Sequence, residues 1–442
     1  MNKLERSGKS VVDHLVNHGF EAYFVGGCVR DKLLNISPKD IDIVSNASPT
    51  DLKRIFDHVI PIGESFGVML VLKDGFEFEV ATARTESSYT DGRRPDKVVF
   101  TSFKDDVLRR DLTINGLLYN PLTDEIIDFT GKGIDDINKG LIRFIGDADC
   151  RINEDKLRML RAVRFAAKYG FTMTKAEFGV IKKNAHKINQ ISAERIKAEL
   201  DKILLSDKPS VGFNLLKESN LLKEILPELE ATSTIPQDKK WHAEGNVFEH
   251  TMLLIDNLRK KTDDLQILWG GLLHDIGKVS VFATIEGKII AHGHDKEGEI
   301  LAESICKRLR FSNKESNMIV SLVRDHMRIK EASKMKLSKK RKLIAQDNFD
   351  KLLLLSITDS ESSISTVEFD KFGFVETLQQ VVNEPKLANL PKPLITGHSL
   401  IELGMKPNKD FKQILEEVYE LQLQETVTTK EEAINYIKRR DL

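Results

Sequence analysis

The sequence predicts an α+β protein, with a head of mixed strands and helices followed by an all-helical body. Three observations lead to this fold class. Up to residue 148, short runs of alternating apolar and polar residues are interleaved with runs of helical period. From Asn153 onward the helical period dominates and strand signals nearly vanish. With 442 residues the chain can bury roughly two to four cores, so strands and helices can form separate domains.

We expect four segments in this order. A nucleotide-handling head covers residues 1–148, and a helical neck rich in Lys and Arg covers 149–225. A helical region over 226–380 carries a group of histidines. A proline-marked link then leads to a helical tail over 381–442.

The composition narrows the class of protein. Lys and Arg number 67 and Asp and Glu number 68, so no global positive field exists to gather nucleic acid, and any such binding must use local patches. The 3 cysteines are far apart and odd in number, which argues against a disulfide framework and for a reducing compartment. The first helix lacks the apolar core of a signal peptide, and no apolar run approaches the length of a membrane span. We therefore expect a soluble, cytoplasmic protein with no membrane partner.

The stretch from Tyr23 to Val44 carries the first functional pattern. Gly26 and Gly27 end an apolar run and open a helix, where a backbone can approach a phosphate closely. Arg30 follows and offers a fork for phosphate oxygens. About ten residues later, Asp40 and Asp42 alternate with isoleucines, so a strand places both carboxylates on one face. Two such carboxylates are ligands for Mg²⁺. The glycines alone could form an ordinary turn, and the two acids alone could form a solvated strand end. Together, in this order, they favour a metal-dependent site for a nucleoside triphosphate.

The rest of the head follows in order. A helix is expected over 49–56, and two strands joined by a turn over 67–72 and 77–82. The second strand contains Glu79, which is a candidate third acid and equally interpretable as a solvated strand residue. The polar, turn-rich stretch 84–96 is expected to be a mobile loop.

An apolar helix is predicted over 108–119. Its first turn carries Arg109 and Arg110, which offer guanidinium forks to a triphosphate, and Asp111, which can cap the helix or orient a neighbour. An Arg-Arg pair is usually a surface feature. We single this pair out because the glycine turn and the two acids precede it.

A second pattern lies in the neck. Asp155 and Arg158 are three residues apart, so a helix makes them neighbours, and an ordinary intrahelical ion pair is the common explanation. The functional alternative is that the pair reads a base. Asp155 can accept from the exocyclic amino group of cytosine or adenine while Arg158 donates to the ring nitrogen. Uracil and guanine place a carbonyl where that amino group would be, which opposes two acceptors. Such a pair would select C and A without a template, with Arg161 and Arg164 continuing towards phosphates or the RNA backbone.

Taken in order, these motifs resemble those of the bacterial (class II) tRNA nucleotidyltransferases of the poly(A) polymerase family. The glycine turn with Asp40-x-Asp42, the run Arg109–Asn115 and the run Glu154–Phe165 carry the resemblance. Asp128–Asp135 is similar to the family's hinge motif and Ile191–Leu200 to its neck motif, so the match covers about residues 1–225. Two positions depart from the pattern: Gly116 stands where Ala is usual, and Phe129–Thr130 where Pro is common.

The resemblance implies a DNA polymerase β-like head, two-metal nucleotidyl transfer with Mg²⁺, and addition of C, C and A to tRNA 3′ ends from CTP and ATP. Asp40 and Asp42 would be the metal ligands, with Glu79 as a further catalytic candidate. The stretch 84–96 resembles the flexible loop of enzymes that add the full CCA. The candidate nucleotide-binding residues are Gly26, Gly27, Arg30, Arg109, Arg110, Asp111, Asn115, Asp155, Arg158, Arg161 and Arg164.

The histidine region carries a further set of candidate metal ligands. A His-Asp pair on an apolar helix is unusual as core filler, and imidazole with carboxylate suits Mn, Fe, Ni or Zn. The order of these residues resembles HD phosphohydrolase domains. It favours a second divalent transition metal over a degenerate domain that only buries its histidines. Lys278 would face a substrate phosphate, and activity on 2′,3′-cyclic or 2′-phosphate ends is a further hypothesis. The candidate ligands are His250, His274, Asp275, His294, His326 and Asp359.

Several rival functions remain open at the level of the sequence. A poly(A) polymerase, or a partial enzyme that adds only CC or A, shares the head motifs. A non-catalytic module that binds RNA or nucleotides is a rival from another class. In a further alternative, the phosphohydrolase is the main activity of the protein and the head is vestigial. The expected partner is tRNA, held at its acceptor arm by the basic helices after residue 150 and by the tail. No protein partner is indicated.

Overall fold

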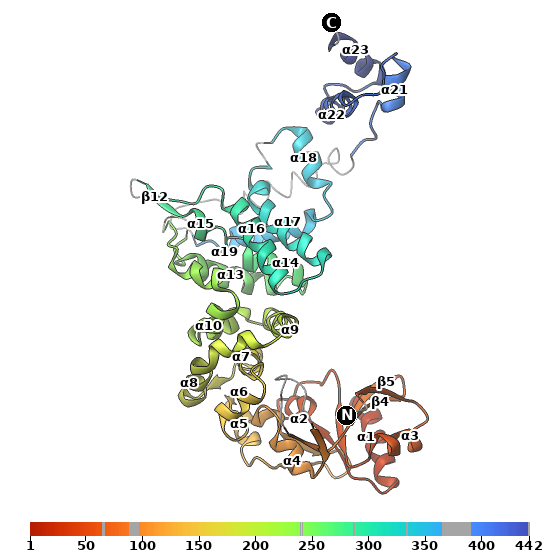
Figure 1. Cartoon of the computed structure of the whole chain (residues 1–442), viewed down its shortest axis with the longest axis vertical. Helices are drawn as coiled ribbons and strands as arrows, with labels where there is room; N and C mark the ends of the chain where they lie inside the picture. Colours follow the sequence, from red (N-terminus) through yellow and green to blue (C-terminus); the bar gives the residue numbers. More distant parts are fainter. Residues whose placement is uncertain are drawn as a thin grey trace. The chain divides into compact units, whose positions relative to one another are not determined.

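The computed structural model describes residues 1–63, 67–87, 97–238, 240, 242–285, 288–332, 335–364 and 390–440. It forms two compact units, Met1–Glu230 and Ala231–Leu442 (Figure 1). The predicted head and neck segments both lie in the first unit. The predicted fold class, a mixed sheet with helices followed by a helical body, is confirmed.

The head is built on a seven-stranded mixed sheet with the order β3-β4-β5-β2-β1-β8-β9. β2 and β5 pair in parallel, and the other neighbours are antiparallel. Asp74 and Gly75 both have positive φ, as a tight two-residue hairpin turn requires, and the predicted hairpin of β4 and β5 is present. The strands are β1 (Ala22–Val25), β2 (Asp42–Ser45), β3 (Val59–Gly63), β4 (Val68–Lys73), β5 (Phe76–Thr82), β8 (Leu117–Asn120) and β9 (Glu125–Asp128).

Helices pack on both faces of this sheet. α1 (Lys3–Asn17) begins at a capping box of Asn2 and Glu5, and its apolar side is buried. It comes close to the sheet at Gly8, where a Cβ atom would lie 3.0 Å from Phe24. On the other face, Val107 of α4 (Phe103–Leu108) packs in a cluster with Val25, Val44, Ala83 and Leu118. The residues that follow α4 therefore begin on the side of the sheet to which the Val44 side chain points.

Two sequence predictions for the head are wrong in part. The helix expected over 108–119 is replaced by the 3₁₀ turn η2 (Thr113–Asn115) and strand β8, because Leu112 forms a β-bridge with Phe144 and β8 pairs with β1 and β9. Tertiary pairing here overrides the local helical period. The expected loop 84–96 begins as strand β6 (Arg84–Ser87), which pairs with β7 (Lys97–Phe100). Residues 88–96 lie outside the described residues.

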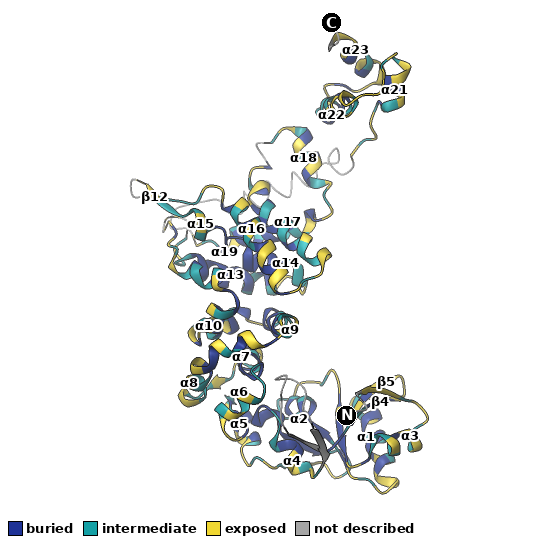
Figure 2. Cartoon of the chain, in the orientation of Figure 1, coloured by how far each residue is buried: buried dark blue, intermediate teal, exposed yellow. Residues whose placement is uncertain are grey.

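The remainder of the first unit is mainly helical. α7 (Arg158–Tyr169) is largely buried, and its residues Met159, Leu160, Ala162 and Val163 are fully buried. Figure 2 colours the chain by burial. Two short strands, β10 (Leu141–Ile142) and β11 (Thr172–Met173), pair in parallel beside α7. The helices are α2 (Gly27–Leu33), α3 (Pro49–Ile55), α5 (Gly133–Lys139), α6 (Ala148–Glu154), α7 (Arg158–Tyr169), α8 (Lys175–Asn184), η3 (Ala185–Gln190), α9 (Ala193–Leu204), α10 (Pro209–Glu218), α11 (Leu221–Ile225) and α12 (Pro227–Ala231), the last of which crosses the unit boundary.

Across the described residues of the second unit, the regular structure is helical apart from one small hairpin. Gly271 of α14 allows close helix contact, since a Cβ atom there would lie 2.3 Å from Leu258 of α13. Ile395, Leu400 and Ile414 belong to a separate apolar cluster near the C-terminus. No helix among the described residues is both long and apolar enough to span a membrane. The elements are η4 (Thr232–Thr234), α13 (Val247–Arg259), α14 (Leu265–Leu273), α15 (Lys278–Val281), β12 (Ala283–Ile285), β13 (Lys288–Ile290), α16 (His294–Arg308), α17 (Asn313–Lys330), α18 (Leu337–Ile344), α19 (Phe349–Ser362), α21 (Gly397–Glu402), α22 (Asp410–Leu423) and α23 (Lys430–Arg440).

Candidate functional site

Three acidic residues gather at one face of the head sheet. The parallel register of β2 and β5 places Asp42 opposite Glu79. Asp40 lies two residues before Asp42, the first residue of β2, and its charge acts on the Asp42 carboxylate. Asp42 reaches solvent, yet desolvation of its carboxylate raises its pKa to about 6, and the charges of Glu79 and Asp40 add to the increase. The structure thus brings all three sequence candidates together.

The glycine turn lies against Arg110. Gly26 has a φ of 76°, a conformation that glycine adopts without strain, and it joins β1 to α2. A Cβ atom at Gly26 would lie 3.3 Å from Nη1 of Arg110. The positive charge of Arg110 also acts on Asp42, whose pKa it lowers against the larger effect of burial. Arg110 is therefore close to both the turn and the acids.

Asp106 orients both arginines and was not among the sequence candidates. It is buried on α4, where Oδ1 accepts from Nη2 of Arg109 at 2.7 Å and Oδ2 accepts from Nη2 of Arg110 at 3.1 Å. Burial acts to raise the pKa of Asp106, but the two guanidinium groups outweigh it and the pKa is lowered. The i,i+3 and i,i+4 spacing from Asp106 to this pair is the signal that could have identified it.

Arg30 is enclosed by protein groups and is not an open fork as the sequence led us to expect. It is 4% exposed, and its Nη2 donates to Asp31 at 2.8 Å while Nη1 donates to Asn115. Its guanidinium lies 4.6 Å from the ring centroid of Tyr169, and the Tyr169 hydroxyl donates to Asp31 at 2.9 Å. Arg30 ties α2 to η2 and α7, and so fixes the helix that follows the glycine turn.

Asp111 links the head to α7 through an ion pair in which Asp111 is buried and Arg161 is partly exposed. Its Oδ2 accepts from Nε of Arg161 at 2.6 Å, and its Oδ1 accepts from Asn115 at 3.1 Å and from the Leu112 amide at 2.8 Å. Burial acts to raise the pKa of Asp111, but Arg161 and these hydrogen bonds lower it to about 2. Asp111 therefore orients its neighbours, one of the two roles expected for it.

This ion pair predicts an acid-sensitive contribution to stability. The pKa of Asp111 in the folded chain, about 2, lies below the ordinary aspartate value of 3.8, so its stabilisation is complete above about pH 4 and is lost as the pH falls towards 2. The difference corresponds to about 2 kcal/mol in the free energy of unfolding. We expect calorimetry of Asp111→Asn to show a lower melting temperature for the first unit at pH 6 and a smaller drop between pH 4 and pH 2 than in the wild type. An unchanged acid profile would contradict this role.

Asp155 and Arg158 do not share a helix face, so that part of the sequence prediction is wrong. α6 ends at Glu154, Asp155 is its extended C-cap, and α7 begins at Arg158. The Asp155 carboxylate accepts from the Leu157 amide at 3.0 Å, and this local turn competes with a continuous helix. The other Asp155 oxygen accepts from Arg195 at 2.6 Å.

The other neck arginines also meet protein partners. Arg158 donates to Glu154 at 2.5 Å and to the Arg109 carbonyl at 2.9 Å. Arg161 binds Asp111, and Nε of Arg164 lies 2.6 Å from Glu199. The expectation that Arg161 and Arg164 point towards phosphates or RNA is not what this geometry shows, because both end in internal ion pairs.

The six histidine-region candidates converge in the second unit. His250 comes from α13, His274 and Asp275 follow α14, His294 opens α16, His326 lies on α17 and Asp359 on α19. Two sets of ligand atoms each lie within 4.8 Å of one another, one of His250, His274 and Asp359 and the other of Asp275, His294 and His326. Nε2 of His274 lies 3.2 Å from Asp275, so the two sets adjoin.

The orientation of these histidines suits metal binding. Nδ1 of His274, His294 and His326 each lies 2.6–2.8 Å from a backbone carbonyl three residues earlier. A carbonyl only accepts, so each Nδ1 is the donor and each Nε2 faces the cluster; the Nε2 atoms of His294 and His326 are 3.2 Å apart. Outer hydrogen bonds of this kind hold imidazole ligands in metal sites. The donor set of imidazoles and carboxylates therefore fits a divalent transition metal.

The charges in the cluster also favour a cation. Burial acts to raise the pKa of Asp275 and Asp359, but the charges of His274 and Lys278 on the first, and of Lys330 on the second, hold both well below their usual range. Burial lowers the pKa of His326 to about 3. Asp275 and Asp359 are thus ionised and His326 is neutral at neutral pH, as metal ligands must be. Burial acts to lower the pKa of His250, but its hydrogen bonds to Asp359 and Glu244 raise that pKa to about 9, so a metal ion has to displace a proton from this ring. Nζ of Lys330 bonds Asp359 at 2.6 Å, and this lysine was not among the sequence candidates.

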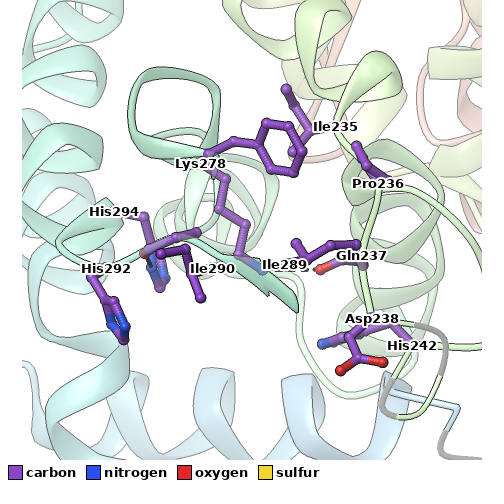
Figure 3. Close-up of a pocket in the computed structure, with 12 residues that line it drawn as sticks. Ile235, Pro236, Gln237, Asp238, His242, Lys278, Ile289, Ile290, His292 and His294 are labelled. Atoms are coloured by element: carbon purple, nitrogen blue, oxygen red, sulfur yellow. Dashed lines mark hydrogen bonds between the residues drawn. The ribbon is translucent and has the colours of Figure 1, made fainter. Parts of the chain in front are cut away.

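A cavity of about 380 Å³ adjoins this cluster (Figure 3). Ile235, Ile289 and Ile290 form apolar parts of its lining, and His294 and Lys278 bring it to the ligand cluster. Nζ of Lys278 donates to Asp275 at 2.6 Å and to Gln237 at 2.9 Å. The volume is at the lower end of the range for small-molecule sites, roughly 300 to 1,000 Å³.

Comparison with family models agrees with this architecture. Residues 22–143 match the poly A polymerase head domain, and residues 170–232 match the probable RNA and SrmB-binding site of polymerase A. Residues 247–360 match the HD domain. The chain therefore carries a polymerase head, an RNA-binding region and an HD domain, and the family resemblance drawn from the motifs is confirmed. The head and HD domains imply dependence on divalent metal ions.

Two of the curated proteins similar to this chain are CCA-adding enzymes. The enzyme of Limosilactobacillus reuteri (strain DSM 20016) is 42% identical over 242 residues, which cover 54% of this chain and 59% of that protein. The enzyme of Bacillus pumilus (strain SAFR-032) is 39% identical over 268 residues, covering 60% of this chain and 62% of that protein. The matched region thus spans about three fifths of the length of these relatives.

Solved structures support the same fold. A Bacillus stearothermophilus CCA-adding enzyme in complex with CTP superposes with a TM-score of 0.75 at 23% identity, covering 100% of this chain and 99% of that one. A Thermotoga maritima CCA-adding enzyme complexed with tRNA gives a TM-score of 0.60 at 19% identity, covering 98% and 94%. At these identities the likeness establishes the fold.

Proposed function

We propose that this chain, with its polymerase head, RNA-binding region and HD domain, is a CCA tRNA nucleotidyltransferase that adds C, C and A to tRNA 3′ ends from CTP and ATP. The observation that carries the proposal is the grouping of Asp40, Asp42 and Glu79 on one sheet face beside Gly26 and Arg110. Matched relatives of this chain are CCA-adding enzymes, which favours this product over poly(A). We place the protein in the cytoplasm with its tRNA substrate.

In the proposed reaction, the RNA 3′-oxygen attacks the α-phosphorus of the nucleotide, and the bond between that phosphorus and the pyrophosphate oxygen breaks. Mg²⁺ held by Asp40 and Asp42 would lower the pKa of the hydroxyl and stabilise the departing charge. Gly26 gives the phosphates room to approach the backbone, and Arg110 lies against that turn. Asp106 holds Arg109 and Arg110 in place, so their orientation does not have to be created on binding.

Asp155 and Arg158 remain our candidates for reading the base. Because Asp155 bonds Arg195 and Arg158 bonds Glu154, each has to exchange a protein partner for the base edge. Arg158 is tied to the carbonyl of Arg109, which places it next to the arginine pair beside the glycine turn. Arg158 is thus connected to the proposed triphosphate site through a direct contact with Arg109.

Substitution of Asp155 tests the base-reading role. We expect Asp155→Ala to reduce the preference for C and A over U and G by roughly 5- to 150-fold, since a bidentate base contact contributes about 1–3 kcal/mol of discrimination. Single-nucleotide incorporation on tRNA lacking its 3′ end measures this ratio. Asp207→Ala, an exposed aspartate of the same unit, is the matched control. An unchanged preference in Asp155→Ala would remove base reading from this residue.

One incubation tests the main proposal against its rivals. The purified chain is supplied with tRNA that ends before CCA, with each labelled nucleoside triphosphate separately and in combination, and with Mg²⁺. Incorporation of two C residues and then one A, followed by a stop, supports CCA addition. A growing A tail indicates a poly(A) polymerase, and addition of only CC or only A indicates a partial enzyme. No synthesis indicates a binding module or a vestigial head.

The donor set in the second unit favours a second function, a metal-dependent phosphohydrolase. Water would attack a phosphate ester, and the P–O bond to the alcohol would break with release of a phosphomonoester or phosphate. His250, His274 and Asp359 would hold one ion and Asp275, His294 and His326 another, which would supply an activated water. We propose Mn, Fe, Ni or Zn for this site. Opening of a 2′,3′-cyclic phosphate to a phosphomonoester, or release of inorganic phosphate from a 2′-phosphate RNA end, is the test, and neither reaction with any of these metals would refute it.

A further inference from the structure

One histidine of the cluster in the second unit is oriented differently from the others. His274, His294 and His326 use backbone carbonyls as outer partners. His250 is fully buried on α13, and its Nδ1 lies 2.8 Å from Oε1 of Glu244 while its Nε2 lies 2.9 Å from Asp359. The main-chain carbonyls that serve the other three rings are replaced here by a carboxylate from outside the helix.

We propose that Glu244 is the positioning residue of this metal site, which fixes His250 with Nε2 directed at the ion. The inference rests on the proposed phosphohydrolase site and assigns a residue that neither the motif order nor the donor set includes. A carboxylate on Nδ1 keeps the proton on that nitrogen, so the proton released when a metal ion binds is the one that Nε2 donates to Asp359, and its loss gives the metal the Nε2 lone pair. A carboxylate partner also makes the imidazole a more basic, and so stronger, metal ligand than a neutral carbonyl partner would.

Glu244 is itself held in place by the main chain. Its side chain is 5% exposed, and Oε2 accepts from the Ile364 amide at 2.8 Å. The Ala243 amide donates to the Ile364 carbonyl at 2.7 Å, so two hydrogen bonds join this segment to Ile364, which lies two residues after the end of α19. α19 carries Asp359, the carboxylate that faces Nε2 of His250. Glu244 therefore fixes the distance between His250 and Asp359 as well as the orientation of the His250 ring.

The same carboxylate connects the ligand cluster to the neighbouring cavity. Nδ1 of His242 lies 2.8 Å from Oε1 of Glu244, and the two imidazole rings pack edge to face with centroids 4.9 Å apart. His242 is also part of the cavity lining (Figure 3). Glu244 thus holds one ring at the cavity and one at the metal site. Since ligand atoms of His242, Glu244 and His250 lie within 4.8 Å, a third ion bound by Glu244 directly is the competing arrangement.

Co²⁺ binding to the full chain distinguishes these arrangements. Asp40→Ala and Asp42→Ala are introduced together to remove the proposed head site, and the metal-free chain is titrated with Co²⁺ while its visible absorption and its bound metal are measured. We expect Glu244→Ala to weaken Co²⁺ binding by about 10- to 100-fold, with a changed absorption band and the same number of ions at saturation. Glu244→Gln keeps an oxygen that accepts from Nδ1 and recovers most of the affinity.

The control is Glu303→Ala, an exposed glutamate of the same unit, which leaves Co²⁺ binding unchanged. Circular dichroism melting of each variant shows that the chain is folded. Equal affinity in wild type and Glu244→Ala overturns the positioning role alone. Loss of one bound ion in both Glu244→Ala and Glu244→Gln overturns it in favour of direct ligation. A wild-type chain that binds no Co²⁺ overturns the metal site and, with it, this inference.

Discussion

Asp42→Ala is expected to lower incorporation of every nucleotide by at least about 10³-fold while the affinity for tRNA stays within about twofold of the wild type. The loss corresponds to about 4 kcal/mol of transition-state stabilisation, a reasonable share for a ligand of two catalytic ions. Asp42 faces Glu79 and shares the negative field of Asp40, so its removal leaves too few charges to hold a cation there. Incorporation rates with CTP and with ATP test the loss of activity, and a filter-binding measurement with tRNA tests the unchanged affinity.

The same variant should not lose stability. Because desolvation and neighbouring carboxylates raise the pKa of Asp42 to about 6, its charge works against folding at neutral pH, and Ala removes that repulsion. Asp57→Ala, an exposed aspartate of the head, is the matched control and should keep full activity. Normal incorporation by Asp42→Ala would refute the metal assignment, and a parallel loss of tRNA affinity or melting temperature would show that the effect is structural.

Asp275→Asn is expected to reduce phosphate-ester hydrolysis by the second unit by at least about 10³-fold, with loss of bound transition metal. Asp275 lies 3.2 Å from Nε2 of His274 and 3.4 Å from Nε2 of His294, so it adjoins both sets of ligands. Asn keeps the shape and a hydrogen-bond acceptor for Lys278 but loses the charge that ligates a divalent ion. Metal analysis of the purified chain and hydrolysis of a 2′,3′-cyclic phosphate test the prediction.

A matched control for this substitution is available in the same unit. Asp256→Asn changes a half-exposed aspartate of α13 and should leave bound metal and hydrolysis unchanged. Incorporation of C and A by the Asp275→Asn chain reports whether the first unit is intact. Full hydrolysis after Asp275→Asn would contradict the two-ion arrangement, whereas absence of hydrolysis in the wild type would point to a structural HD domain.

Local patterns predicted the acids and the glycine turn well because their geometry depends on short-range periodicity. The alternation of Asp40 and Asp42 with isoleucines indicated that the two acids lie close together, although β2 begins only at Asp42, and the hairpin before Glu79 follows from turn chemistry. The segment after Arg109 was predicted poorly, since pairing of β8 with β1 and β9 outweighs its helical pattern. Likewise, Asp155 and Arg158 have helical spacing, but the Asp155 side chain caps a turn between two helices.

The sequence by itself determined which chemical groups this protein has to work with: paired acids on a strand, glycines before a helix, and a series of histidines and aspartates on apolar helices. Their order and spacing are properties of the chain, so they could be recognised without coordinates. Only the tertiary structure decided how each group is used. Arg30, Arg161 and Arg164 end in internal contacts, and Asp106 and Glu244 orient neighbours, because these outcomes depend on partners that folding supplies.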